Sequence, residues 1–96
     1  MGKALVGEIF YVDTFGNLIA NIDEDQFSRF TEARSPVIKV AKERMYGLKK
    51  GYSFGKRGET MALLGSSGFL EVCVREGDAR EKLKVKKGDP VRVEIP

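Results

Sequence analysis

The residues best suited to chemistry stand in a short segment near the start of the chain. Asp13 and Asn17 place a carboxylate and an amide two residues on either side of Phe15. An aromatic ring left exposed in a turn forfeits roughly 1.5–3 kcal/mol of burial, whereas a flat apolar ring beside such polar groups suits a nucleoside. The alternative is that Phe15 folds into the core while Asp13 and Asn17 satisfy the backbone of the turn.

A second segment, Gly65-Ser66-Ser67-Gly68, offers two hydroxyls and several backbone N–H groups. Its glycines tolerate positive φ, so the segment is able to hold a carboxylate or a phosphate. An ordinary hairpin turn is the alternative. Tyr52, in a glycine-rich stretch, is either a second aromatic wall for a ligand or a lid over apolar side chains.

The chain contains no histidine, which limits the chemistry it can perform. This composition excludes Ser-His-Asp and Cys-His nucleophile systems and every imidazole general base. The single cysteine, Cys73, has no partner for an internal disulfide or a zinc site, so we expect no metal and a packing role on a strand.

Length and charge favour one small globular domain, with residues 1–96 as a single unit. The net charge of +3 comes from interspersed residues, whereas nucleic-acid-binding proteins usually cluster their basic side chains. The densest basic run, from Lys82 to Lys87, indicates a solvated face more than a phosphate site. We expect a cytoplasmic protein, because no segment approaches the roughly 20 apolar residues of a membrane helix and the start lacks a signal-peptide pattern.

Short β-favouring segments predict most of the fold. The expected strands cover residues 5–12, 18–22, 37–40, 44–48, 60–64, 69–75 and 91–95. The first is expected to be covered on both faces, and the strand after Phe69 to have one apolar face. Asp23 with Gln26, and Asp78 with Glu81, have the spacing of helix caps. The pattern predicts an all-β fold, a small closed Greek-key-like barrel of about seven strands with two short helices, with a sandwich as the alternative.

Three co-linear segments are together far more specific than any one of them. They are Gly7 through Ile22, Tyr52 with Gly58-Glu59, and Gly65 through Ala79. In order and spacing they resemble the C-terminal domain of the S-adenosylmethionine hydrolase family. That family forms adenosine, is also called S-adenosylmethionine hydroxide adenosyltransferase, and is related to the fluorinase and chlorinase enzymes.

The resemblance implies roles for residues by their position. Asp13 would bind the ammonium of the methionine part, and Ser66 with Ser67 its carboxylate. Ser67 stands where the halogenating relatives carry arginine, which points to water as the nucleophile.

For the adenosyl part, the resemblance implies that Phe15 and Tyr52 flank the adenine or ribose. Asn17 would bind the adenine edge, completed by backbone groups near Val74 and Glu76. Two positions depart from the family pattern: Ala20 replaces a threonine and Arg75 an asparagine.

The resemblance also implies what lies outside these residues. In the family, an Asp-Arg-His set in an N-terminal domain activates water, and the pocket lies between that domain and the C-terminal domain of a neighbour in a trimer. Without histidine, this chain would be the substrate-binding half, inactive alone, with S-adenosylmethionine as substrate and no cofactor. The alternatives are a small basic β-barrel that binds nucleic acid through stacking on Phe15 and Tyr52, and a structural trimerisation domain.

Overall fold

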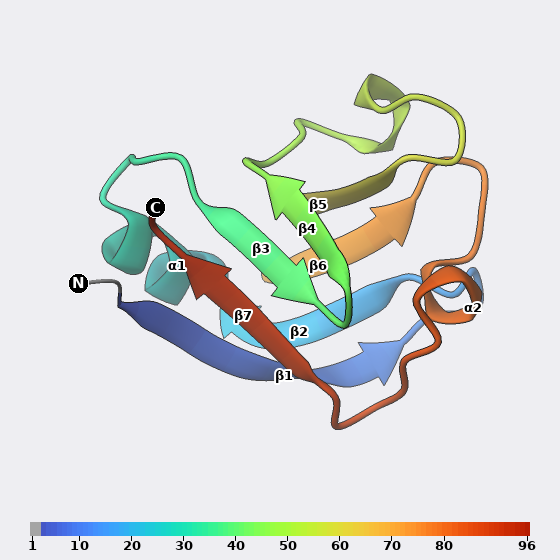
Figure 1. Ribbon diagram of the computed structural model, residues 1–96, viewed down its shortest axis with the longest axis horizontal. Helices are drawn as coiled ribbons and strands as arrows, with labels where there is room; N and C mark the ends of the chain where they lie inside the picture. Colours follow the sequence, from blue (N-terminus) through green and yellow to red (C-terminus); the bar gives the residue numbers. More distant parts are fainter. Residues whose placement is uncertain (1–2) are drawn as a thin grey trace.

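The computed structural model describes residues 3–96 as seven strands and two α-helices (Figure 1). The strands are β1 (Ala4–Val12), β2 (Leu18–Asp23), β3 (Val37–Val40), β4 (Glu43–Tyr46), β5 (Thr60–Leu64), β6 (Phe69–Val74) and β7 (Pro90–Glu94). The helices are α1 (Glu24–Thr31) and α2 (Ala79–Leu83), and a 3-10 turn, η1 (Tyr52–Phe54), lies in the glycine-rich stretch between β4 and β5. Among residues 3–96, no helix has the length and apolar character needed to cross a bilayer.

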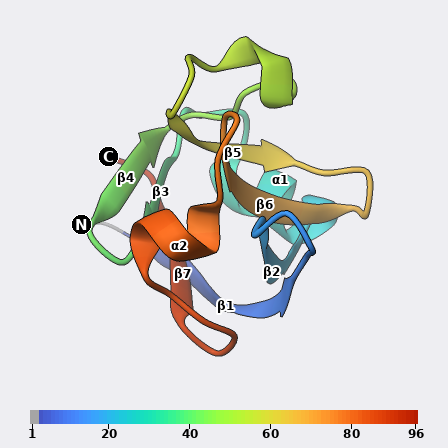
Figure 2. The same ribbon diagram turned by 90° about the vertical axis from the view of Figure 1, so that its right-hand side faces the viewer.

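The seven strands form one antiparallel sheet that curls into a nearly closed barrel. Their order is β4-β3-β7-β1-β2-β6-β5, and Figure 2 shows them arranged around a ring. The two edge strands approach each other, and the Lys49 N–H donates to the Ala62 carbonyl at 2.9 Å beside them. The prediction of an all-β barrel with two short helices is therefore confirmed.

The interior is filled by the apolar residues of alternating strand positions. Fully buried members include Ile9, Leu18, Ile22, Ile38, Leu70, Val72, Val91 and Val93. Helix α1 adds Phe27 to this core. Its start follows the predicted capping box, because the Asp23 carboxylate accepts from the Gln26 N–H while the Gln26 side chain accepts from the Asp23 N–H.

Two expectations about strand faces are wrong. Strand β1 is not covered on both faces, since Val6, Phe10 and Tyr11 are exposed and the register shifts between Ile9 and Tyr11. A bulge of this kind inserts a residue that the partner strand does not match and so turns side chains outward.

Strand β6, by contrast, is buried on both faces. Its second face carries Glu71 and Cys73, and Cys73 packs with Met61 and Leu63 in a small separate cluster. Gly55 lies against Met61, so the stretch that contains η1 covers this side. The alternation of apolar and polar residues in β6 gave no indication that another segment would cover its second face.

Helix α2 supports the turn between β1 and β2. In Figure 2 this turn is blue and faces the viewer. The Arg80 N–H donates to the Gly16 carbonyl at 3.0 Å, and the Asp78 carboxylate caps the helix by accepting from the Glu81 N–H. Gly16 has a φ of 81°, and a Cβ there would collide with the Asp78 carboxylate. The turn is therefore seated on the first residues of α2.

We predict that Gly16→Ala lowers the free energy of unfolding by about 3 kcal/mol or more, since it combines a left-handed backbone with a collision against the helix cap. Gly58→Ala is the matched control, because Gly58 has a φ of 80° with open space around its Cβ position. It should cost only the backbone strain, about 1–2 kcal/mol. Urea unfolding of both variants gives the comparison, and equal losses would contradict the seating of the turn on α2.

Candidate functional site

The turn between β1 and β2 is organised by the Asp13 carboxylate. One carboxylate oxygen accepts from the Phe15 and Asn17 backbone N–H groups at 2.9 Å each, and the other accepts from the Asn17 side-chain amide at 2.9 Å. Phe15 is 74% exposed. The structure thus combines the two interpretations of this segment: Asp13 and Asn17 satisfy the turn, yet Phe15 does not enter the core.

These bonds leave the turn able to bind something else. A carboxylate has about four lone-pair positions, so Asp13 can accept from a further donor beyond its three. Asn17 uses one amide hydrogen on Asp13 and keeps its carbonyl oxygen and second hydrogen. The turn therefore presents an exposed aromatic ring, an amide with both donor and acceptor capacity, and a carboxylate.

Tyr52 and Ser67 meet at a residue that the sequence analysis did not select. The Tyr52 hydroxyl donates to one oxygen of Glu71 at 2.7 Å, and the Ser67 hydroxyl donates to the other at 3.4 Å. Glu71 is only 6% exposed. The one sequence signal for Glu71 was its position as a carboxylate within an otherwise apolar run, Leu70 to Val74. A single charged residue in such a run looks like the solvent-facing residue of an ordinary strand.

The surroundings of Tyr52 keep its phenol protonated. Burial raises the pKa of the Tyr52 phenol, and the hydrogen bond and charge of Glu71 and the charge of Asp13 raise it further. The phenol therefore remains a donor to Glu71, the acceptor that it shares with Ser67.

Strand register explains this arrangement. Glu71 pairs with Ile19 of β2 and Leu63 of β5, and Ile19 pairs with Tyr11 of β1. Paired residues of antiparallel strands share a face, so these four lie in one row on the outer face, the face of β1, β2, β6 and β5 turned away from the core.

The remaining predicted residues lie at the two ends of β6. Ser66 is exposed in the turn before the strand. At the other end the Val74 side chain is buried and its carbonyl accepts from the Gly77 N–H at 3.1 Å. Glu76 is exposed with a φ of 54°, and its carboxylate pairs with Arg57 and Arg75.

The two departures from the family pattern have clear places. Ala20 is buried in the core opposite Ile9, so it does not reach the outer face. Arg75 donates to the Tyr52 carbonyl at 3.2 Å and thereby braces the segment that carries this tyrosine. Ala20 therefore contributes to core packing and Arg75 to the position of the Tyr52 segment, rather than to the exposed groups of the turn between β1 and β2.

Two hollows of the surface lie away from these residues. One of about 820 Å³ is lined by residues such as Arg29, Phe30 and Ile95, and another of about 400 Å³ lies between β4 and β5. Neither includes a predicted site residue. Within residues 3–96, no three acidic or cysteine side chains gather as metal ligands.

The fold and these groups define a small antiparallel β-barrel domain with an aromatic turn and a serine turn on one outer face. Residues 7–92 match the C-terminal domain of S-adenosylmethionine (SAM) hydroxide adenosyltransferase, and the chain belongs to that family.

Proteins from two thermophilic bacteria are similar to this chain. The (R)-S-adenosyl-L-methionine hydrolase of Thermus thermophilus is 36% identical over 89 residues, which are 91% of this chain and 31% of that protein. A conserved protein from Thermotoga maritima has a crystal structure that matches with a TM-score of 0.79 and 32% identity, over 94% of this chain and 35% of that one. The crystal structure of a conserved protein from Thermus thermophilus matches with a TM-score of 0.74 and 33% identity, over 92% and 34% of the two chains. The chain thus spans about a third of the length of these relatives.

We predict that the domain loses stability at alkaline pH through Cys73. Burial, and then the charges of Glu71 and Asp13, raise the pKa of this thiol from 9.0 to about 11. The folded state therefore favours the neutral thiol, and this contribution is complete below pH 9 and lost as the pH rises through 11, at up to about 1.4 kcal/mol per pH unit.

Urea unfolding between neutral and alkaline pH tests this, with Cys73→Ala as the comparison. The variant should show a shallower fall in unfolding free energy, whatever its stability at neutral pH. Identical slopes for the two proteins would contradict the assignment.

Proposed function

We propose that this chain is the substrate-binding domain of an enzyme that converts SAM and water to adenosine and methionine. Membership of the family and the hydrolase activity for which the Thermus thermophilus relative is named support this proposal. The observation that carries it is the exposed Phe15 ring in a turn whose backbone is satisfied by the Asp13 carboxylate, which also accepts a hydrogen bond from the Asn17 amide.

At the adenosyl end, Phe15 and Tyr52 provide apolar ring faces. The free carbonyl and amide hydrogen of Asn17 suit the adenine edge, since an amide pairs with an adjacent donor and acceptor of that base. Backbone groups near Val74 and Glu76 lie beside the same turn, because Val72 pairs with Leu18 at the start of β2. Their contribution is through the main chain, as the Val74 side chain is buried.

At the methionine end, Asp13 accepts from the ammonium, and the Ser66 hydroxyl, with the Ser67 turn, donates to the carboxylate. Charge-assisted bonds of this kind contribute about 1.5–3 kcal/mol each.

The reaction itself requires a second domain. This chain has no histidine, so the activation of water for attack on the ribose C5′ falls to the Asp-Arg-His set that the family resemblance places in an N-terminal domain. The Phe15 ring and Ser66 are exposed, and the Tyr52 ring is half-exposed. We therefore propose that a neighbouring protomer of a trimer covers them, excludes bulk water and encloses the substrate, in a cytoplasmic enzyme without cofactor.

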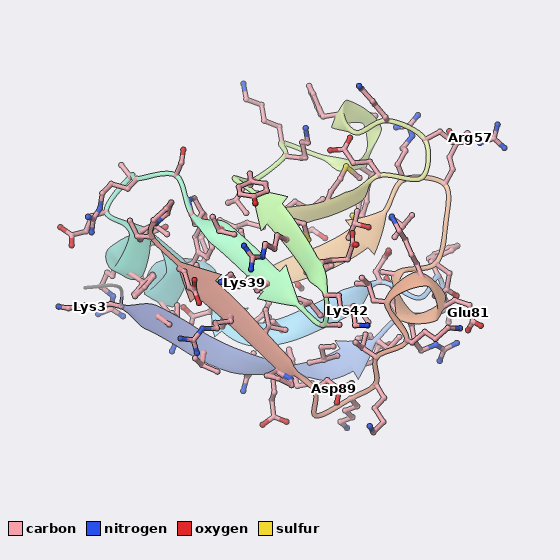
Figure 3. All side chains as sticks on the ribbon, in the orientation of Figure 1. Lys3, Lys39, Lys42, Arg57, Glu81 and Asp89 are labelled. Carbon is pink, nitrogen blue, oxygen red and sulfur yellow. The ribbon has the colours of Figure 1, made fainter. Side chains whose placement is uncertain are left out.

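The distribution of charge weighs against nucleic acid as the partner. Several basic residues pair with acidic neighbours, among them Arg29, Lys39, Arg57, Lys86 and Arg92. In Figure 3 the labelled basic residues Lys3 and Arg57 point away from opposite sides of the molecule, at the left and at the upper right. Salt-sensitive binding to single-stranded DNA by this chain would revive that alternative.

We predict that Phe15→Ala weakens SAM turnover without unfolding the domain. Loss of a ring that stacks on a base costs about 1–3 kcal/mol, which is about a 5- to 150-fold fall in kcat/KM. The assay combines this chain with a matching N-terminal domain and measures adenosine by chromatography. Tyr46→Ala is the matched control, because Tyr46 is 75% exposed on β4, away from the site.

The comparison has two informative failures. An assembled complex that forms no adenosine would refute the proposed activity. Equal losses for Phe15→Ala and Tyr46→Ala would leave the activity in place and refute the position of the adenosyl group.

A further inference from the structure

A buried carboxylate at the centre of the outer face joins two parts of the proposed site. Glu71 accepts from the hydroxyls of Tyr52 and Ser67, one on each oxygen. Tyr52 belongs to the stretch after β4, whereas Ser67 belongs to the turn between β5 and β6. One side chain thus links two segments that are 15 residues apart in the sequence.

The surroundings of Glu71 indicate that it contributes little to the free energy of unfolding. No ion pair among residues 3–96 includes it, so its two side-chain donors are neutral hydroxyls. Desolvation of a carboxylate largely offsets hydrogen bonds of this kind. An apolar side chain would fill the same place between Ile19 and Leu63, its neighbours on the paired strands, without that cost.

The turn before β6 is shaped around this carboxylate. A Cβ at Gly65 would collide with the Glu71 side chain, so glycine allows the carboxylate to lie directly against the backbone. The turn then closes through the Gly68 N–H, which donates to the Gly65 carbonyl at 3.0 Å. Ser66 therefore lies between Gly65, which packs on Glu71, and Ser67, whose hydroxyl donates to Glu71.

We propose that Glu71 is a positioning residue that sets the spacing between the Tyr52 ring and the Ser66-Ser67 turn by accepting a hydrogen bond from each segment. The identity of the ligand so positioned rests on the proposed function. Glu71 itself touches no ligand in this arrangement. Its hydrogen bond with the Tyr52 hydroxyl fixes the angle of a half-exposed ring, and its hydrogen bond with Ser67 fixes the direction of that hydroxyl and the position of the turn.

The first test uses the 96-residue chain alone and does not depend on SAM. Amide hydrogen exchange of residues 51–55 and 65–68 is compared in Glu71→Leu, Glu71→Gln and Tyr52→Phe. Loss of one hydrogen bond should raise exchange about tenfold, at both segments in Glu71→Leu and at 51–55 in Tyr52→Phe. Glutamine still accepts from Tyr52 and bonds Ser67, so Glu71→Gln should stay near the parent protein.

The controls separate positioning from folding and from charge. Glu81→Gln removes a carboxylate that projects from α2 (Figure 3) and should leave both segments unchanged. If Glu71→Leu fails to fold, Tyr52→Phe carries the test, because it deletes only a hydroxyl. Unchanged exchange in Tyr52→Phe, or equal disturbance by glutamine and leucine at position 71, would overturn the proposal.

The second test uses the complex with the N-terminal domain. Glu71→Leu should raise the KM for SAM about tenfold or more with a smaller change in kcat, since a misplaced wall weakens substrate binding, and Glu71→Gln should restore it. A loss confined to kcat would overturn the positioning role. If the parent complex forms no adenosine, the proposed function fails while the exchange experiment still decides the role of Glu71.

Discussion

The arrangement of the outer face depends on the Asp13 carboxylate and the three donors that it satisfies. A turn that had to bury its aromatic residue would draw Phe15 inward, but here the side chain of Asp13 meets the polar demands of the backbone. The ring is therefore left exposed at little cost to the turn itself. Helix α2 fixes the turn from below through the bond between Arg80 and Gly16, so the exposed ring is presented on a rigid support.

Pairing of neighbouring strands builds the rest of the outer face. Strands β2, β6 and β5 are successive members of the sheet, and their register aligns Ile19, Glu71 and Leu63. The stretch with η1 then crosses this row and delivers Tyr52 to Glu71. Two segments with no local connection thus become one surface through strand pairing, which is a property of the whole fold.

Local chemistry made much of the fold predictable. Strand positions, the Asp23 capping box and the Asp78 cap depend on neighbouring residues, and the structure reproduces them. The covered face of β6 and the exposed face of β1 were not predictable, because each depends on what a distant segment does. For the same reason, Glu71 resembled a solvent-facing strand residue until the position of Tyr52 was known. The expectation that Asp13, Tyr52 and Ser67 belong to one site came from the family resemblance, not from their spacing.

The contact between Gly65 and Glu71 also bears on how this domain can vary among its relatives. A side chain at position 65 would occupy the space of the carboxylate, so it is tolerated only where residue 71 is smaller or turned aside. We therefore expect substitutions at positions 65 and 71 to be coupled, with each residue limiting the side chains that the other position accepts.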